Sequence, residues 1–549
     1  MGSKKDSIFV LILLSIAAVL LSTQTTPNTP INPDPDYESQ ETIDINKDGK
    51  NPGIGVATDN PYATEVGMEV LKRGGNAVDA AIAISYSLSV LEPYASGIGG
   101  GGLMLVHPAD GTKPVLYDYR ETAPDNEDKP EAGIGVPGFV AGMDKAHNDF
   151  GTRSMKVLLE PSINQAKNGI RVSSMLHLRL NNANYRIPPT EASLFYPNNK
   201  AIEEGRKLKQ EELAETITDI SENGPDVFYK GKIGEELADK VDGIETEDLE
   251  DYEVEKTEPI KGEFAGFYVY TPPPPSGGTM LIQSLQMAEH LQVSNLKENP
   301  SEFIQANGEI NREAYKDRLE TIGDPKYVDM SVDELTSKEY AENLASDVSL
   351  NALNDEKLVD TEPEKDGNTT HFVVVDQDGM MVSATNTLSN FFGSGFFTNG
   401  FFLNNQLENF SSSSNSPNSY EPGKRPFSYI TPTVLAKNDI PLIGIGSAGG
   451  RRIVPTLSQV LTRHLLFKQP IHEAIDENRS HRDMHNKKIY LEGRITNKIK
   501  EELEDAGYTV DNTKAPLYFG SVQSLTVDYN KEKIYGGSDH RRNGKWMSR

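Results

Sequence analysis

The hydrophobic pattern divides the chain into an apolar N-terminal run, a polar spacer and a long segment of mixed periodicity. Residues 8–21 are largely apolar and follow two lysines. This length is short for a membrane-spanning helix and typical of the core of a signal peptide. We therefore expect residues 1–24 to be a signal peptide, with an uncleaved N-terminal anchor as the alternative. Either form predicts an exported protein at the cell surface or outside the cell.

Residues 25–53 are rich in Pro, Asn, Thr and Asp and poor in large apolar side chains, which predicts a flexible linker. Asp44, Asn46 and Asp48 within it imitate the start of a calcium-binding loop. The twelfth position of that loop is Gly55, where a bidentate Glu is needed. The ten histidines show no metal-ligand spacing either, so we predict no metal site.

From residue 54 onward, helical and extended patterns alternate, which predicts a mixed α and β protein. Residues 61–90 carry apolar groups at helical spacing, and residues 103–106 resemble a strand. The glycine-rich stretch 96–102 lies between them. A dinucleotide-binding fingerprint follows a strand and opens a helix, whereas this stretch does the reverse. We therefore predict no nucleotide cofactor, and interpret the glycines as a loop that needs close backbone approach.

The middle of the chain, residues 150–350, is charged and mostly helical in pattern, and the acidic residues 340–366 are predicted to form an exposed loop. The character changes directly afterwards. Residues 371–375 and 380–384 are apolar or alternating around an Asp-Gln-Asp-Gly turn, which predicts a β-hairpin. A strand that begins abruptly at Thr369 after such a loop is an unusual boundary within one chain.

The composition excludes several classes of function. A net charge of −28 argues against a nucleic-acid partner, because affinity for phosphates comes from clustered Lys and Arg. An anionic substrate has to be attracted by local arginines against this field. The absence of cysteine excludes a Cys nucleophile, a Cys-based zinc site and disulfides.

The Thr-Thr-His sequence at 369–371 has an ordinary explanation by itself, since β-branched residues favour strands. Its surroundings add an ordered set of further motifs, at 118–122, 136–138, 273–278, 385–390, 392–395, 404–410 and 446–452. This set resembles the γ-glutamyltranspeptidase family from about residue 54 to the C-terminus.

The resemblance implies an α+β fold, the four-layered αββα sandwich of N-terminal-nucleophile hydrolases. It also implies that the chain cuts itself between Asn368 and Thr369. Residues 54–368 would then form a large subunit and residues 369–549 a small one. The two subunits would share one core and associate as a heterodimer.

The chemistry of Thr369 can be derived from its expected position. A threonine hydroxyl is a poor nucleophile until a base takes its proton. Once Thr369 is the first residue of a new chain, its own α-amino group, with an unperturbed pKa of about 8, is within reach as that base. Before cleavage, the same hydroxyl would attack the carbonyl of Asn368 and give an ester that water opens.

Four further residues receive roles from the family match. Thr387 corresponds to the threonine that orients the nucleophile. Gly449 and Gly450 correspond to the oxyanion hole, since glycines present backbone N–H groups without obstruction. Arg120 corresponds to the arginine that binds the substrate α-carboxylate, a bidentate task suited to guanidinium.

Two departures from the family pattern bear on the substrate. Asn409 stands where family members that act on glutathione have an aspartate, and Ser389 stands at a second contact to the substrate ammonium. Loss of the anionic partner removes a charge-assisted hydrogen bond of roughly 1.5–3 kcal/mol. A donor whose α-nitrogen is already an amide does not need that partner. Interior units of poly-γ-glutamate have this feature, so we predict that polymer as the substrate.

Other positions fit a polyanionic donor. Gln406 is a further predicted substrate contact, and the short segment between Phe410 and Arg425 suggests an open groove. The cations predicted along this groove are Arg451, Arg452, Arg541 and Arg542.

Transfer of the γ-glutamyl group to a cell-wall amine such as peptidoglycan would anchor a polymer, whereas water would shorten it. One alternative is a general γ-glutamyltranspeptidase or glutathione hydrolase. Another is a non-catalytic wall-binding scaffold.

Overall fold

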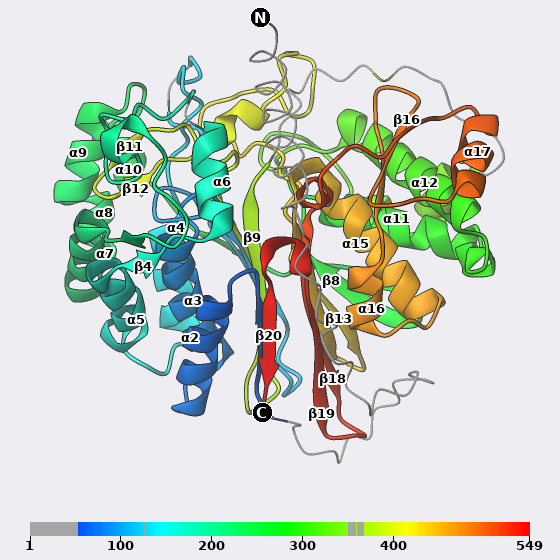
Figure 1. The fold of residues 1–549 in the computed structure, drawn as a ribbon, viewed down its shortest axis with the longest axis horizontal. Coiled ribbons are helices and arrows are strands. Elements are labelled where there is room, and N and C mark those ends of the chain that lie inside the picture. Colours follow the sequence, from blue (N-terminus) through cyan, green and yellow to red (C-terminus); the bar gives the residue numbers. More distant parts are fainter. Residues whose placement is uncertain (1–52, 126, 184, 350–357, 359–366) are drawn as a thin grey trace, which may run out of the picture. The chain divides into compact units, whose positions relative to one another are not determined.

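Two β-sheets lie face to face in the computed structural model, and helices cover the outer face of each (Figure 1). The structure describes residues 53–125, 127–183, 185–349, 358 and 367–549. This helix–sheet–sheet–helix arrangement confirms the predicted four-layered αββα fold. The predictions for residues 1–24 and for nearly all of 25–53 lie outside the described residues.

The first sheet runs in the order β20-β1-β9-β10-β2-β3-β6. Its strands are β1 Gly55–Thr58, β2 Gly101–His107, β3 Val115–Asp118, β6 Glu255–Thr257, β9 Thr369–Val375, β10 Met381–Thr387 and β20 Lys545–Ser548. Side chains alternate between the two faces of a strand. In β9, Phe372 and Val374 therefore pack on the helical side, whereas Val373 and Val375 face the second sheet.

The second sheet runs in the order β19-β18-β14-β13-β8-β7. Its strands are β7 Ile260–Phe264, β8 Phe267–Thr271, β13 Thr433–Lys437, β14 Ile440–Ala448, β18 Ser521–Asp528 and β19 Lys533–Ser538. Glycines allow β14 to approach β9 closely. A Cβ atom on Gly444 would lie 2.4 Å from Val373 Cγ1, and one on Gly446 would lie 2.2 Å from His371 Cε1.

The helices divide between the two sheets. Those of the first half are α2 Pro61–Lys72, α3 Ala77–Leu91, α4 Phe139–Phe150, α5 Met155–Asn168, α6 Ser174–Ala183, α7 Glu211–Asn223, α8 Asp226–Tyr229, α9 Lys232–Lys240 and α10 Thr246–Glu250. Those of the second half are α11 Gly278–His290, α12 Pro300–Thr321, α13 Val332–Leu335, α14 Lys338–Ser346, α15 Ile453–Leu461, α16 Ile471–Asp476 and α17 Asn497–Asp505. Helices α2 and α3 contact the first sheet, and α11, α15 and α16 contact the second.

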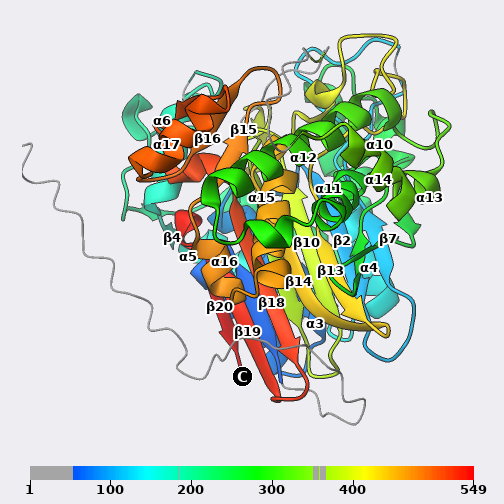
Figure 2. The ribbon, with the colours of Figure 1, turned by 90° about the vertical axis from the view of Figure 1, so that its right-hand side faces the viewer.

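Smaller elements complete the described structure. Short strands pair as β4 Ile170–Arg171 with β5 Lys207–Leu208, as β11 Phe397–Thr398 with β12 Phe401–Phe402, and as β15 Ser480–Arg482, β16 Lys488–Leu491 and β17 Thr509–Asp511. The last group and α17 enclose a small core of their own. This subdomain lies beside α12 and α15 (Figure 2). Short 3₁₀ helices that matter below are η3 Gln406–Asn409, η4 Gly450–Arg452, η6 Pro516–Phe519 and η7 His540–Arg542.

Most elements predicted from the pattern are present. The helical stretch 61–90 is two helices, because the chain turns at Gly74 and Gly75 and Asn76 caps α3 with a capping box. The hairpin and the strand at 103–106 are confirmed as β9–β10 and β2. The glycine loop is confirmed as a place of close approach, since a Cβ atom on Gly100 would lie 2.3 Å from the Thr387 carbonyl oxygen.

The prediction that residues 150–350 are mostly helical is confirmed, although the segment also contains the short strands β4 to β8. One prediction for this part of the chain needs correction. The predicted loop 340–366 begins inside helix α14, because Ala341 and Ala345 form a narrow buried face on a segment that is otherwise polar. Residues 350–357 and 359–366 lie outside the described part. Within the described part, no helix is both long and apolar enough to cross a membrane.

Candidate active site

The two predicted hydroxyls lie side by side at one end of the central hairpin. Thr369 begins β9, and Thr387 ends β10 directly opposite it in the strand register. Strand alternation turns Thr369 to the same face as His371 and Val373, toward the second sheet. Both threonines are buried, and their Oγ1 atoms are 3.3 Å apart. The β-hairpin therefore brings the predicted nucleophile and its orienting residue together.

The Thr387 hydroxyl also contacts the Asn368–Thr369 peptide bond. It donates a hydrogen bond to the carbonyl oxygen of Asn368 at 3.0 Å and accepts one from the Ser389 N–H at 2.9 Å. A hydroxyl has one proton to donate. Since the carbonyl takes the proton of Thr387, Thr369 is the donor in the threonine pair. Hydrogen bonds thus run from the Thr369 hydroxyl through Thr387 to the adjacent carbonyl.

Asn368 is held by hydrogen bonds from its backbone and from its side chain. Its N–H donates to the Ser389 carbonyl at 2.8 Å, and its side-chain Nδ2 donates to the Tyr94 carbonyl at 3.0 Å. Among the described residues, its Oδ1 atom has no hydrogen-bond partner. These contacts fix the peptide bond that is the predicted cleavage site.

Gly449 and Gly450 lie next to this bond. They follow strand β14 and open η4, which leads into α15. Their φ angles of 143° and 59° are disfavoured for residues with side chains. A Cβ atom on Gly367 would lie 2.7 Å from Gly450 Cα, so the segment before the cleavage site packs on the predicted oxyanion hole. Backbone N–H groups at the start of a helix favour negative charge.

A cavity of about 50 Å³ opens beside Thr369. Its walls come from the cleavage segment, from β10 and its continuation, from η3, from residues 427–430 and from η4. Predicted residues that line it are Thr369, Thr387, Ser389, Gln406, Asn409, Gly450 and Arg451. Gln406 Nε2 is buried and has no hydrogen-bond partner among the described residues. A polar group in this position is suited to bind a polar atom of a substrate.

Arg120 does not line this cavity. Its guanidinium is buried and pairs with both carboxylate oxygens of Asp118, the shortest contact being 2.5 Å. Its Nη1 donates to the carbonyl oxygens of Pro275 and Pro426. Arg120 and the neighbouring Arg425 hold the pKa of Asp118 below its usual value against the effect of burial. Binding of a substrate carboxylate by Arg120 stays a prediction that requires a change of partners.

Arg542 contacts the nucleophile residue instead of the cavity. Its Nη1 donates to the backbone carbonyl of Thr369 at 2.9 Å. Two buried acids lie near its charge. Burial raises the pKa of Asp59 to about 6 and that of Glu92 to about 7, although Arg542 lowers both. The guanidinium of Arg542, from η7, thus contacts the first residue of strand β9, and a role of Arg542 in substrate binding stays a prediction.

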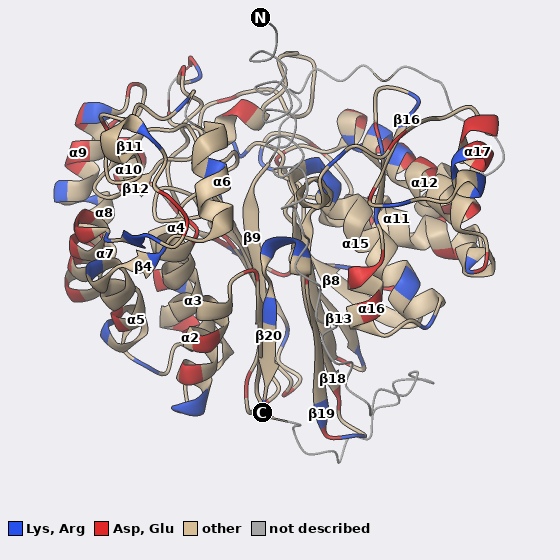
Figure 3. Cartoon of the chain, in the orientation of Figure 1, with Lys and Arg blue, Asp and Glu red and all other residues tan. Residues whose placement is uncertain are grey.

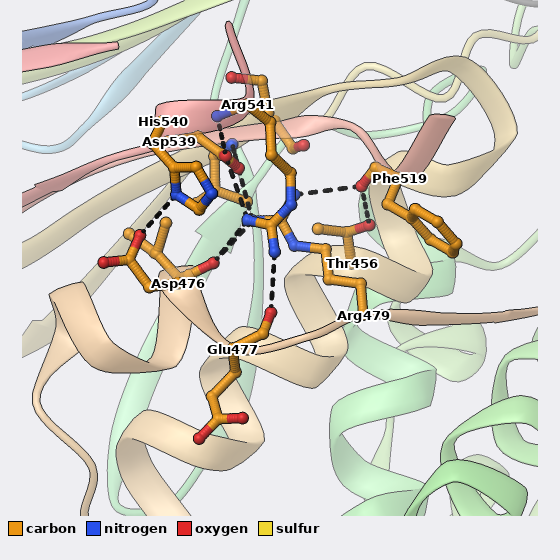
Figure 4. Close-up of polar contacts among 12 residues, drawn as sticks. Thr456, Asp476, Glu477, Arg479, Phe519, Asp539, His540 and Arg541 are labelled. Atoms are coloured by element: carbon orange, nitrogen blue, oxygen red, sulfur yellow. Dashed lines mark hydrogen bonds and ion pairs between the residues drawn. The ribbon is translucent and has the colours of Figure 1, made fainter. Parts of the chain in front are cut away.

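Arg541 is part of a buried ion cluster (Figure 4). Its guanidinium pairs with Glu492 at 2.6 Å and with Asp539 at 3.1 Å, and Arg479 pairs with Asp539 at 2.5 Å. The Arg541 side chain is 1% exposed. The prediction that Arg541 faces a substrate groove is therefore wrong. Glu492 and Asp539 neutralise its charge inside the fold.

Arg451 and Arg452 belong to η4 and directly precede α15. Arg451 lines the cavity, and its Nη1 is 3.0 Å from Nε2 of His485. The guanidinium of Arg452 lies over the ring of Tyr518, 4.3 Å from its centroid. Both side chains are therefore close to the cavity, and Arg451 is in its wall.

The family model for gamma-glutamyltranspeptidase matches residues 63–548. The chain belongs to this family. Its substrates are accordingly a γ-glutamyl donor and an acceptor, and it is an N-terminal-nucleophile γ-glutamyl transferase or hydrolase. This confirms the predicted family and class of enzyme. No group of three potential metal ligands occurs in the part of the chain that the structure describes.

Alignments with known proteins extend over nearly the whole length of this γ-glutamyltranspeptidase. It is 43% identical over 504 residues to the capsule biosynthesis protein CapD proenzyme of Bacillus anthracis, with 92% of each chain covered. It is 33% identical over 555 residues to the glutathione hydrolase proenzyme of Bacillus subtilis (strain 168), with 93% of each covered. The crystal structure of cephalosporin acylase from Bacillus halodurans superposes with a TM-score of 0.82 at 25% identity, over 94% of this chain and 98% of that one.

One wall of this γ-glutamyltranspeptidase site was not predicted from the sequence. Phe427 and Tyr429 line the cavity. Arg318 supports them from α12, since its guanidinium lies 3.9 Å from the Phe427 centroid and its Nη2 donates to the Tyr429 hydroxyl at 3.0 Å. Aromatic residues at 427 and 429 with a polar residue between them are a visible strand-like pattern. Arg318, which is more than 100 positions away, gives no such indication.

Proposed function

We propose that this γ-glutamyltranspeptidase cuts itself between Asn368 and Thr369 and then cleaves poly-γ-glutamate through an ester on Thr369. The observation that carries the proposal is the hydrogen-bond path from the Thr369 hydroxyl through Thr387 to the Asn368 carbonyl. This path orients the nucleophile and polarises the bond that it attacks. The word proenzyme in the names of both relatives supports processing of this kind.

In the first reaction, Thr369 Oγ1 attacks the carbonyl carbon of Asn368 and loses its proton. The C–N bond then breaks, the nitrogen gains a proton and becomes the free α-amino group of Thr369, and Asn368 is left as an ester on Oγ1. Water hydrolyses this ester to the Asn368 carboxylate and the free hydroxyl. Residues 54–368 and 369–549 become the large and small subunits.

In the second reaction, the α-amino group of Thr369 takes the hydroxyl proton while Oγ1 attacks the γ-carbonyl of the substrate. The N–H groups of Gly449 and Gly450 stabilise the oxyanion. The amine leaves with a proton and the γ-glutamyl group stays as an ester. A peptidoglycan amine or water then releases it. Departure of Gly367 from Gly450 after cleavage gives the substrate access to the oxyanion hole.

The polymer as donor is supported by the neutral side chains in the cavity. Ser389 and Asn409 line it where other members of the family hold the ammonium of a free γ-glutamyl residue. An amide nitrogen inside a polymer carries no charge and needs no carboxylate partner. The similarity to a capsule biosynthesis protein supports the same substrate. We also propose export directed by residues 1–24, with residues 25–53 as a linker.

The test compares the kcat/KM for poly-γ-glutamate with that for γ-glutamyl-p-nitroanilide, a donor with a free ammonium. The processed enzyme should favour the polymer, and Asn409→Asp should shift the ratio toward the anilide by roughly 10- to 100-fold through a restored charge-assisted hydrogen bond. Asn409→Gln serves as a control without added charge. A wild-type enzyme that prefers the anilide or glutathione would instead be a glutathione hydrolase, as the second relative is named.

A further inference from the structure

A row of cations and tyrosine rings connects the catalytic cavity with the surface. Arg452 follows the cavity residue Arg451 and lies over Tyr518. Lys514 Nζ is 4.8 Å from the ring centroid of Tyr518 and 5.1 Å from that of Tyr490. Lys488 Nζ is in turn 5.4 Å from the Tyr490 centroid. We call this set the cationic track; its members are Arg452, Tyr518, Lys514, Tyr490 and Lys488.

The track crosses three elements that converge beside the active site. Arg452 belongs to η4, Tyr518 to η6, and Lys488 and Tyr490 to β16 of the small subdomain. The centroids of Tyr490 and Tyr518 are 5.1 Å apart and their planes are tilted by 57°, so the two rings are in direct contact. η6 lies next to the oxyanion glycines, because a Cβ atom on Gly449 would be 3.0 Å from Gly520 Cα.

The members of the track differ in exposure. Arg452 is 6% exposed and Tyr490 is 9% exposed, whereas Tyr518 and Lys488 are half-buried and Lys514 is exposed. Lys488 has an acidic neighbour, Asp511, at 3.7 Å. Lys514 forms no ion pair within 4.0 Å among the residues that the structure describes. Lys514 is therefore the exposed ammonium group of the track, and the Asp511 carboxylate lies near both lysines, whose charges help to lower its pKa.

This local charge opposes that of the whole molecule. The chain has a net charge of −28, so a polyanion is repelled everywhere except where cations gather. A cation within about 6 Å of a tyrosine ring is held in place by the ring while its N–H groups stay available to carboxylates. The methylene groups of a γ-glutamyl unit, in turn, suit the apolar faces of the rings.

We propose that the cationic track binds successive α-carboxylates of poly-γ-glutamate outside the catalytic cavity. The inference rests on the proposed function and extends it. The cavity accommodates the reacting unit, and the track holds the units that continue away from it. Binding energy from these distant units then contributes to catalysis only when the donor is long enough to reach the track.

The test uses the double variant Lys488→Gln/Lys514→Gln of the processed enzyme. Its matched control is Lys498→Gln/Lys500→Gln, which removes the same charge from helix α17 of the same subdomain. Figure 3 shows that α17 carries acidic and basic residues together, and both control lysines already pair with glutamates one turn away. Substrates are γ-linked glutamate chains of about two and about twelve units, with γ-glutamyl-p-nitroanilide as reference.

The track variant should lower kcat/KM for the long chain about five- to tenfold relative to the anilide, through a higher KM and with a weaker dependence on salt. The two-unit chain should not show this selective loss, and the control should behave as the wild type. An equal loss in both double variants, or none in either, overturns the track. A wild-type enzyme that does not cleave the long chain overturns the proposed substrate itself, so the two failures are distinct.

Discussion

At the level of single residues, the hydroxyl of Thr387 has three neighbours that bear on cleavage. It contacts the Thr369 hydroxyl, the Asn368 carbonyl and the Ser389 N–H. The neighbouring hydroxyl of Thr370 is equally buried but points to the opposite face, and it has no hydrogen-bond partner among the described residues. Variants at Thr387 and Thr370 can therefore be compared. The first removes a hydroxyl from the hydrogen-bond path to the Asn368 carbonyl, and the second removes a buried hydroxyl from the same hairpin outside that path.

Thr387→Val keeps the shape of the side chain and removes this hydroxyl. Self-cleavage should slow by about 100-fold, because loss of a donor to a reacting carbonyl typically has this effect. Thr387→Ser should restore most of the rate. The measurement is the fraction of cut chain over time on denaturing gels, with Thr370→Val as the control. Equal rates for Thr387→Val and Thr370→Val would exclude the hydrogen-bond path.

Glu121 gives a prediction for pH. Burial raises its pKa to about 8, and neither of its carboxylate oxygens has a hydrogen-bond partner among the described residues. The folded chain therefore keeps a proton that the unfolded chain has lost above a pKa of about 4.5. Its contribution to the free energy of unfolding falls as pH rises from about 4.5 to about 8.

The substitution Glu121→Gln removes this titration. In the uncut Thr369→Ala background, the free energy of unfolding is compared at pH 5 and pH 8 with and without Glu121→Gln. The decrease between these two pH values should be smaller by several kcal/mol in the chain that carries Glu121→Gln. Urea denaturation at several pH values measures the difference. Parallel stability profiles with and without Glu121→Gln would show that the carboxyl group is ionised in the folded protein.

At the level of elements, the site depends on how closely β14 approaches the nucleophile strand. Gly446 lies against the His371 ring, which burial keeps neutral by lowering its pKa to about 3. The ring accepts or donates one hydrogen bond at Nδ1, with Thr385 at 2.8 Å. A side chain on Gly446 has no space unless the two sheets move apart.

We therefore expect Gly446→Ala to destabilise the uncut chain by about 1–3 kcal/mol and to slow self-cleavage. Gly97→Ala is the matched control, because its Cβ atom would meet only Ser89 at an ordinary distance of 3.7 Å. Thermal unfolding and the cleavage rate are measured for both. A Gly446→Ala chain as stable as Gly97→Ala would mean that the spacing between the sheets is not fixed there.

Some helices, strands and loops could be predicted from the sequence, and others could not. The hairpin and the glycine loop are predictable, because local pattern determines strand alternation and close approach. Strands β6 to β8 were missed inside a charged, helical region, although residues 267–271 (Phe-Tyr-Val-Tyr-Thr) are typical of a strand. The buried ion pair of Arg541 is not predictable from the residues near it in the sequence, because its partner Glu492 lies 49 positions away and contacts it only in the folded chain.

The residues of the candidate site were likewise only partly predictable from the sequence. Thr369, Thr387 and Gly450 were found through motifs and come together as expected. The contacts of Arg120 and Arg542 depend on long-range packing, and the structure gives both a backbone carbonyl as partner. Motifs therefore identify which residues matter, whereas the partners of a buried charge follow from the tertiary structure.

At the level of the whole molecule, the two proposed subunits share both sheets. In the first sheet, β9 lies between β1 of the large subunit and β10 of the small one, and β10 pairs with β2 of the large subunit. In the second sheet, β13 of the small subunit pairs with β8 of the large one. Cleavage at Asn368 removes none of these pairings. The fragments should therefore stay together until the fold is lost.

The most direct test of the central claim is a mass measurement of the purified protein under native and denaturing conditions, beside Thr369→Ala. Under denaturing conditions we expect a fragment of roughly 20 kDa that begins at Thr369, since residues 369–549 make up about a third of a 60.4 kDa chain. Under native conditions both fragments should form one complex, and the variant should stay whole. A single uncut chain in both proteins would contradict Thr369 as the nucleophile and favour the non-catalytic scaffold.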